Sequence, residues 1–376
     1  MKFLKKYKIT NYDFALVLMV VGLTIIGIMA ISSANPGYKN KQIAGLVFGM
    51  FMMVGLSLLD YNFFIKFNWI LYLLNIGLLG LVISPLGSST NGAQRWINLF
   101  GVRFQPSETA KILLILFFAQ FIMKYKDKVK SLGFIIICLA LLSVPLALIA
   151  SQPDLSTCIM IMVIFSAIIF VAGINWKIVI AVLGVSIPAV LFIIYSAIQG
   201  DSSILHDYQQ RRILAWLHPE EYANAEAYQT LNSMMAIGSG QLYGKGYNTN
   251  EISSVLNGGF ISESQTDFIF TVIGEEFGFV GACLVVVLLL VISVRCFMIS
   301  LGARNKAGEI IAAGVGAWIG FQGFMNIGVA TGVVPNTGIP LPFVSYGLTS
   351  LISAYVGIGF VLNVRLQGNK YFSGRL

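Results

Sequence analysis

The chain has 376 residues, of which 57% are hydrophobic and only 11% are charged, and its mean hydropathy is +0.82. Soluble domains carry about 25% charged residues, so this composition excludes a soluble globular protein. The net charge of +8 is spread over short segments between apolar runs, without the basic and aromatic stripe of a nucleic-acid-binding surface. We therefore expect an integral membrane protein that has no nucleic-acid partner.

Apolar runs of the length that a membrane-spanning helix requires follow one another along the whole chain. They are continuous and do not alternate with polar residues, which argues against a β-barrel. The sequence predicts an all-α bundle of ten transmembrane helices in one membrane domain, residues 1–376, with spans at 13–33, 42–60, 67–84, 108–123, 132–150, 155–173, 178–198, 270–294, 309–330 and 346–364.

The first run, 13–33, follows Lys2, Lys5, Lys6 and Lys8 and is too long for the core of a cleaved signal peptide. If the N-terminus is inside, most of the 24 lysines and arginines fall in the inner segments. That distribution obeys the positive-inside rule. Both termini are therefore predicted to be cytoplasmic.

Three predicted outer loops are long or unusual in composition. In 85–107, apolar and polar residues alternate towards the end, which predicts either a short hairpin or an interfacial segment. The stretch 199–269, between helices 7 and 8, is too long for a simple connector, and its residues 226–237 have the apolar spacing of a helix. Prolines and glycines in 331–345 forbid a regular helix there.

One acid, Asp267, stands where the large outer loop meets the eighth apolar run. Thr266 and Asp267 in this position can cap a helix and complement its dipole. The same carboxylate can act as a general base toward a hydroxyl nucleophile, if its site is partly dry and a neighbour tunes its pKa. Spacing alone leaves both interpretations open.

Two further acids are predicted on the same membrane face. Glu108 and Lys111 share a helix face at i, i+3 and can pair, or Lys111 can receive an anionic headgroup. Asp154 lies in a tight outer turn, where aspartate is common. Together Glu108, Asp154 and Asp267 are candidate ligands for a divalent cation, Mg²⁺ or Mn²⁺, held against a pyrophosphate, because Mg²⁺ prefers one or two carboxylates plus phosphate oxygens.

Outer cations supply candidate contacts for phosphate, because a guanidinium group binds phosphate through two hydrogen bonds. Solvated loop charge is the alternative explanation for each of them. The candidates are Arg95, Arg211, Arg212 and Lys245. Deeper in the eighth span, Glu275 and Glu276 are predicted to serve packing or hydrogen bonding, since intramembrane acids usually face the bundle interior.

Short motifs follow one another in a fixed order along nearly the whole chain. They are Arg95-Trp96-Ile97, Gln105-Pro106-Ser107-Glu108 with Lys111, Gln152-Pro153-Asp154, Tyr228-Gln229, Gly238-Ser239-Gly240, Gly244-Lys245-Gly246, Thr266-Asp267-Phe268-Ile269-Phe270, Glu275-Glu276 and Gly338-Ile339-Pro340-Leu341-Pro342-Phe343. In this order they resemble the shape, elongation, division and sporulation family, which includes RodA and FtsW. The short termini and the loop after span three favour the RodA type.

This resemblance implies a peptidoglycan glycosyltransferase in the bacterial cytoplasmic membrane, which polymerises lipid II into nascent glycan at the outer face. The acid matching Asp267 is then the catalytic residue, and the residues matching Glu108, Lys111 and Asp154 line the same cavity. The resemblance also implies a class B penicillin-binding protein as the transpeptidase partner, together with other proteins of the elongation or division machinery.

Two other functions fit the same residues. A lipid II flippase would guide a headgroup across the bilayer, with Glu275 and Glu276 as the lower steps of a polar path. A scaffold for a partner enzyme would tolerate neutral replacement of Asp267 and Lys111. The resemblance favours inverting glycosyl transfer, with Asp267 as base and with Lys111 and the outer arginines stabilising the pyrophosphate that leaves.

Overall fold

The computed structural model describes residues 11–90, 93–99, 102–199, 207–248 and 258–368. Within these ranges, nine helices are long and apolar enough to cross a membrane. They are α1 (Phe14–Ala34), α2 (Lys39–Leu58), α5 (Pro106–Lys124), α6 (Leu132–Ala150), α7 (Leu155–Ala172), α8 (Trp176–Gln199), α11 (Ile269–Leu301), α12 (Lys306–Ala330) and α13 (Leu348–Gln367). The protein is thus a multi-pass membrane protein, as its composition predicted.

The remaining predicted span, 67–84, forms α4 (Asn68–Ile83), which is apolar but only 16 residues long. The total of ten spans and the cytoplasmic placement of the termini therefore stay predictions. Three short helical elements lie between these helices: η3 (Pro36–Tyr38), α3 (Tyr61–Ile65) and η4 (Lys126–Lys128).

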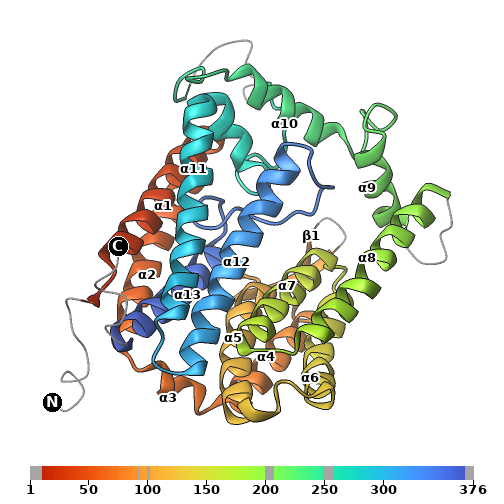
Figure 1. Ribbon diagram of the computed structural model, residues 1–376. Coiled ribbons are helices and arrows are strands. Elements are labelled where there is room, and N and C mark those ends of the chain that lie inside the picture. Colours follow the sequence, from red (N-terminus) through yellow and green to blue (C-terminus); the bar gives the residue numbers. More distant parts are fainter. Residues whose placement is uncertain (1–10, 91–92, 100–101, 200–206, 249–257, 369–376) are drawn as a thin grey trace.

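Helices α5, α12 and α13 form the buried centre of the bundle, since most of their residues are buried (Figure 1). Helix α2 packs on α13, α11 runs beside α12, and α5 lies between α4 and α12. Helix α8 stands at the edge of the bundle with most of its side chains exposed, which suits a helix that faces lipid.

The first outer loop forms a small antiparallel sheet, which confirms the hairpin alternative. Its strands are β1 (Gly87–Thr90), β2 (Ala93–Leu99) and β3 (Val102–Phe104), in the order β1-β2-β3. Ile97 of β2 pairs with Phe104 of β3 and is buried. The sheet therefore carries Arg95, on the same strand as Ile97, to the end of the bundle that is predicted to face outward.

The large outer loop contains α9 (Asp207–Leu217) and α10 (Tyr228–Ser239), so the helix predicted over 226–237 is confirmed. Residues 331–347 hold no helix, as their prolines and glycines predicted. Helix α11 extends beyond the predicted span 270–294 and is not continuous, because Gly278 has non-helical torsion angles (φ 64°, ψ −163°). That break was not predicted.

Candidate active site

Asp267 lies in a turn directly before α11, and tertiary contacts hold it there. The side-chain amide of Asn326, on α12, donates to the backbone carbonyl oxygens of Asp267 and Ile339, both at 2.7 Å. Phe268 is the N-cap of α11 and makes no side-chain cap hydrogen bond. The capping role considered for Thr266 is therefore wrong, because its hydroxyl donates to the Glu263 carboxylate instead (2.9 Å).

The loop of residues 336–345, which connects α12 to α13, forms one wall of the site. Side chains from three helices bind its backbone carbonyl oxygens: Arg212 binds Asn336 at 3.2 Å, Ser156 binds Thr337 at 2.7 Å, Asn326 binds Ile339 at 2.7 Å and Gln322 binds Pro340 at 2.8 Å. Gly338 adopts a positive φ of 66°, and a Cβ there would lie 3.4 Å from the Asp267 Oδ2 atom. The Asp267 carboxylate therefore lies against this loop and is not turned out into the hydrocarbon.

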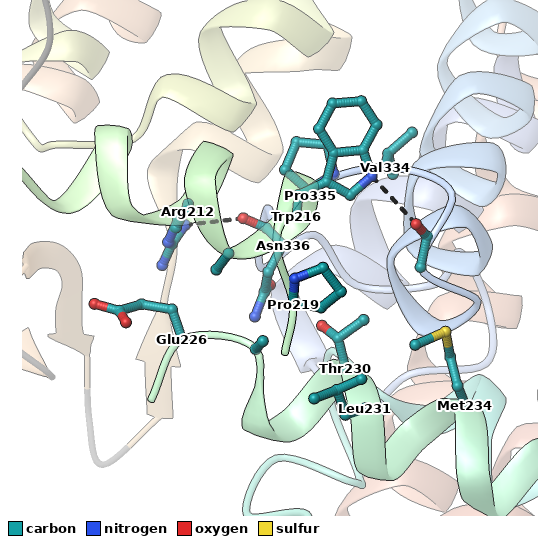
Figure 2. Close-up of a pocket in the computed structure, with 13 residues that line it drawn as sticks. Arg212, Trp216, Pro219, Glu226, Thr230, Leu231, Met234, Val334, Pro335 and Asn336 are labelled. Carbon is teal, nitrogen blue, oxygen red and sulfur yellow. Dashed lines mark hydrogen bonds between the residues drawn. The ribbon is translucent and has the colours of Figure 1, made fainter. Parts of the chain in front are cut away.

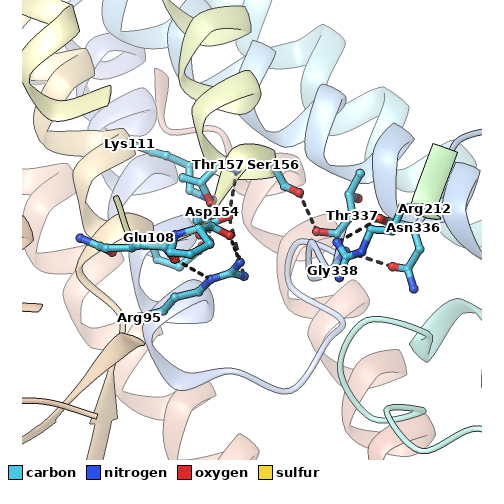
Figure 3. Close-up of polar contacts among 12 residues, drawn as sticks. Arg95, Glu108, Lys111, Asp154, Ser156, Thr157, Arg212, Asn336, Thr337 and Gly338 are labelled. Carbon is cyan, nitrogen blue, oxygen red and sulfur yellow. Dashed lines mark hydrogen bonds and ion pairs between the residues drawn. The ribbon is translucent and has the colours of Figure 1, made fainter. Parts of the chain in front are cut away.

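Asp154 and Arg95 form the second wall (Figure 3). Asp154 lies in the predicted turn, and its carboxylate caps α7 by accepting from the backbone amide (3.2 Å) and the hydroxyl (2.9 Å) of Thr157. Arg95 lies 3.9 Å from Asp154 Oδ1, and its guanidinium also donates to the carbonyl oxygens of Gln152 and Pro153. Ser156 is the second residue of α7, and its hydroxyl donates to the carbonyl oxygen of Thr337, which joins this wall to the 336–345 loop.

The charges of these walls act on Asp267, which lies outside the membrane-spanning helices. Burial raises the pKa of its carboxyl group from 3.8 to about 6, and Glu263 and Asp154 add to the rise. Arg212 and Arg95 lower the pKa and offset part of that effect. The fold thus brings Asp267, Asp154, Arg95 and Arg212 into one electrostatic environment, and it leaves Asp267 with the pKa of a usable base.

Lys111 and Glu108 lie in the first turns of α5. The Lys111 ammonium is 2.8 Å from Glu108 Oε1 and 2.8 Å from Gln322 Oε1, and it lies 5.1 Å from the centre of the Trp318 ring. The predicted i, i+3 pair is therefore confirmed, and both side chains are buried. Lys111 supports the 336–345 loop through Gln322. Its direct contact with a headgroup stays a prediction.

The three acids do not assemble the metal site that the sequence predicted. No group of three or more His, Cys, Asp or Glu side chains in the described ranges is placed to hold a metal ion. The reason is that the Glu108 carboxylate turns to Lys111, whereas Asp154 turns to Thr157 and Arg95. A requirement for Mg²⁺ or Mn²⁺ stays a prediction.

The other predicted cations separate into two groups. Arg212 belongs to the site through Asn336 and Asp267. Arg211, its neighbour in sequence, points elsewhere and lies 3.7 Å from Glu226. Lys245 forms an ion pair with buried Glu275 (2.8 Å) inside α11. Substrate contacts of Arg211 and Lys245 stay predictions.

A small open pocket of about 50 Å³ lies beside Arg212, between α9, α10 and residues 332–336 (Figure 2). Trp216 lines it and donates through its indole nitrogen to the carbonyl oxygen of Gly332 (3.2 Å). Glu226 and Thr230 contribute polar groups from the opposite side. The pocket has room only for a small group beside Arg212.

Several residues that build the site were not singled out from the sequence. The Asn326 and Gln322 side-chain amides donate to the backbone carbonyl oxygens of Asp267 and Pro340. The Ser345 hydroxyl donates to the Thr266 carbonyl oxygen (2.6 Å) and accepts from the Leu341 amide (2.7 Å). The sequence does contain a signal for Gln322 and Asn326. They lie four residues apart in an apolar span, so they share a helix face, and amide side chains are costly in lipid unless they face the bundle interior.

We expect replacement of Asn326 by leucine to lower kcat about 10²-fold, because a displacement of about 1 Å at a reacting group has that effect. It also leaves two buried carbonyl oxygens without their donor, at about 1–3 kcal/mol of stability. The matched control is Asn75→Leu, since Asn75 is buried in α4 and neither amide atom has a hydrogen-bond partner in the described residues. Turnover and thermal unfolding of both variants check this, and equal effects would contradict it.

Together these features define a polytopic membrane protein that holds a partly buried acid and two arginines at one end of its bundle. The chain belongs to the FtsW/RodA/SpoVE family of cell cycle proteins, whose family model matches residues 9–370. A probable peptidoglycan glycosyltransferase FtsW of Geobacter sulfurreducens is 33% identical over 96% of this chain and 97% of the relative. The peptidoglycan glycosyltransferase MrdB of Escherichia coli is 32% identical over 94% and 93%.

Solved structures agree with this assignment. One comes from work on the structural coordination of polymerization and crosslinking by a peptidoglycan synthase complex, with a TM-score of 0.76 at 27% identity over 94% of this chain and 97% of that chain. The crystal structure of the rod shape determining protein RodA of Thermus thermophilus has a TM-score of 0.67 at 26% identity, over 94% and 96%.

Proposed function

We infer that this protein is a peptidoglycan glycosyltransferase, which polymerises lipid II into glycan strands at the outer face of the bacterial cytoplasmic membrane. Relatives of that name match it at 32–33% identity over nearly their whole length. One observation supports Asp267 as the reactive group of the site. Its carboxylate lies against Gly338, and the charges of Arg95 and Arg212 act on it.

In the proposed reaction, Asp267 takes the proton of the acceptor sugar hydroxyl. The oxygen forms a bond to the anomeric carbon of the lipid-linked donor, and the bond from that carbon to the pyrophosphate oxygen breaks with inversion. Arg95 and Arg212 stabilise the negative charge on the polyprenyl pyrophosphate that leaves. Base catalysis of this kind contributes about 10²–10⁴-fold, and positioning of the two sugars supplies a further part.

Lys111 has a supporting role in this scheme. In the present conformation its ammonium binds Glu108 and Gln322, and Gln322 in turn binds Pro340 of the loop beside Asp267. The headgroup contact predicted from the sequence requires that a phosphate oxygen replace Gln322 as the acceptor. The polyprenyl tails of donor and acceptor stay in the bilayer, which explains why a membrane bundle carries the site.

The partner proposed for this protein is a class B penicillin-binding protein that acts as transpeptidase. Support comes from the solved neighbour, because its title describes a peptidoglycan synthase complex that coordinates polymerization and crosslinking. The elongation-type role stays a prediction, because relatives called FtsW and MrdB match at similar identity.

Lipid II confined to one leaflet of a vesicle separates this proposal from the flippase alternative. We expect purified protein to form polymer from substrate in the outer-equivalent leaflet without moving it across. Movement of lipid II without polymer would assign transport instead. Glu275 and Glu276, the lower steps of the flippase path, are bound by Lys245 and Ser33, and nothing in that arrangement favours a conducting path.

We expect the polymerisation rate to fall as the pH is lowered through about 6. A base works only as the carboxylate, and burial raises the pKa of Asp267 to about 6, so activity is present above that pH and is lost below it. Turnover of labelled lipid II from about pH 5 to about pH 8 checks this, with substrate binding measured at each pH as the control. A rate that stays constant down to about pH 4 would contradict it.

A further inference from the structure

Helix α11 is interrupted within its apolar length, nine residues after it begins. Gly278 has φ 64° and ψ −163°, so the helical hydrogen bonds across it are lost. Backbone N–H and C=O groups freed in this way are costly at membrane depth unless other groups bind them.

Residues 240–248, which follow α10 in the outer loop, bind these freed groups. Four backbone hydrogen bonds join this segment to α11: Lys245 N to Glu275 O at 2.9 Å, Gly246 N to Glu276 O at 3.1 Å, Phe279 N to Gln241 O at 2.8 Å and Val280 N to Leu242 O at 3.2 Å. They reach both sides of the break, so the segment takes the place of the missing helical turn.

The fit between segment 240–248 and α11 depends on glycine. A Cβ on Gly240 would lie 2.0 Å from the Gly274 carbonyl oxygen, and a Cβ on Gly244 would lie 2.1 Å from the Glu276 carbonyl oxygen. Gly244 also has a positive φ of 81°, which other residues rarely adopt. Direct contact of the two backbones therefore needs the Gly-rich sequence that precedes α11.

Side chains lock the same contact. The Lys245 ammonium lies 2.8 Å from Glu275 Oε1, and the Glu275 side chain is completely buried. Glu276 accepts from the Ser33 hydroxyl of α1 and from the Asn248 backbone amide (3.2 Å). The hydrogen-bonding role predicted for the two acids is confirmed, and they join the segment, α11 and α1.

The outer half of α11, residues 269–277, begins two residues after Asp267, so its direction sets where the carboxylate lies. The Ser233 hydroxyl of α10 bonds with that of Thr271 (2.5 Å) and donates to the Ala330 carbonyl oxygen (2.7 Å), which braces this half on α12. We propose that segment 240–248 holds the outer half of α11, and with it Asp267, in the catalytic position, with Lys245 and Glu275 as positioning residues. This inference rests on the proposed catalytic role of Asp267.

The first test breaks the ion pair in the full-length enzyme. Lys245→Met and Glu275→Gln are expected to lower kcat about 10²-fold and to change KM less than about 2-fold, because the acid is displaced while the substrate contacts remain. The reversed pair, Lys245→Glu with Glu275→Lys, is expected to recover at least about 10-fold of the loss over either single variant.

The matched control for this test is Arg295→Met. It breaks the ion pair of Arg295 with Asp13 (2.7 Å), which joins the other half of the same helix to α1. Its kcat per folded molecule should stay within about 2-fold of the wild-type value. If Lys245→Met and Glu275→Gln lower only the amount of folded protein, and the kcat per folded molecule stays at the wild-type value, the Lys245–Glu275 pair is merely structural and the proposal is overturned.

A second test addresses the backbone contact and does not depend on the ion pair. Gly244 and Gly246 both have positive φ, 81° and 96°, so alanine meets the same backbone strain at each. Only at Gly244 would the new Cβ strike α11, because nothing lies within 4 Å of it at Gly246. Gly244→Ala should match Lys245→Met in kcat, and Gly246→Ala should stay within about 3-fold of wild type. Equal effects at the two glycines would overturn the proposed contact.

The proposal and the base assignment fail in different ways. If Asp267→Asn is inactive while Lys245→Met and Gly244→Ala turn over like wild type, the positioning segment is rejected and Asp267 is retained. If Asp267→Asn polymerises lipid II normally, the base assignment is rejected, and the positioning proposal that rests on it is rejected as well.

Discussion

Replacement of Asp267 by asparagine is expected to lower polymerisation of lipid II by about 10²–10⁴-fold, the contribution of a general base. Asparagine has nearly the same shape, and the hydrogen bond from Asn326 goes to the backbone carbonyl oxygen of residue 267, so the turn should persist. The amide cannot take up a proton at neutral pH. Polymer from labelled lipid II, quantified on a gel with purified protein, measures the loss, and an unimpaired yield would reject Asp267 as the base.

Glu263→Gln is the matched control for Asp267→Asn. Glu263 is an acid of the same turn whose charge raises the pKa of Asp267. Removal of that charge should leave polymerisation at neutral pH within about 3-fold of wild type and should move the midpoint of the pH profile downward. A loss as large as that of Asp267→Asn would show that the reaction needs Glu263 as well, and would contradict the assignment of the base to Asp267 alone.

Lys111→Met is expected to destabilise the protein by about 3–5 kcal/mol, because it leaves the Glu108 carboxylate buried without its charge partner. Both side chains are almost completely buried, at 2% and 4% exposure. Glu108→Gln combined with Lys111→Met removes both charges and should recover most of the stability. The midpoint of thermal unfolding in detergent measures these effects, and a stable single variant would contradict the buried pair.

The chain offers a matched ion pair for comparison. Lys306 and Glu309 have the same i, i+3 spacing and a similar distance, 2.9 Å, but their side chains are 30% and 29% exposed. Lys306→Met should therefore cost only about 0–1 kcal/mol. The double variant at 108 and 111 also tests the second role of Lys111, since a headgroup contact would leave it folded but with a raised KM for lipid II.

The spans were predictable because lipid imposes a simple rule on sequence. A helix that crosses a bilayer needs a long apolar run, and the polar groups at its ends mark its limits. The predicted spans 132–150 and 155–173 accordingly match α6 and α7 within one residue. The break in α11 escaped prediction because the groups that compensate for it come from residues 240–248, which are distant along the chain from Gly278.

The composition of the site was only partly predictable, because neighbouring residues can bind different partners. Arg211 and Arg212 are adjacent and chemically identical, yet Arg212 binds Asn336 beside Asp267 and Arg211 points to Glu226. In the same way, the predicted metal ligand Glu108 turned to Lys111. Such choices depend on which partner the packed helices bring within hydrogen-bonding distance.

The amino-acid sequence alone determined the class of protein, its apolar spans and the acid before α11, since hydropathy and motif order are local properties of the chain. Only the tertiary structure decided that the 336–345 loop and Asn326 hold Asp267, that Lys245 pairs with Glu275 of α11, and that three acids do not form a metal site. The physical reason is that a buried polar group must find a partner, and distant segments supply that partner only after the helices have packed.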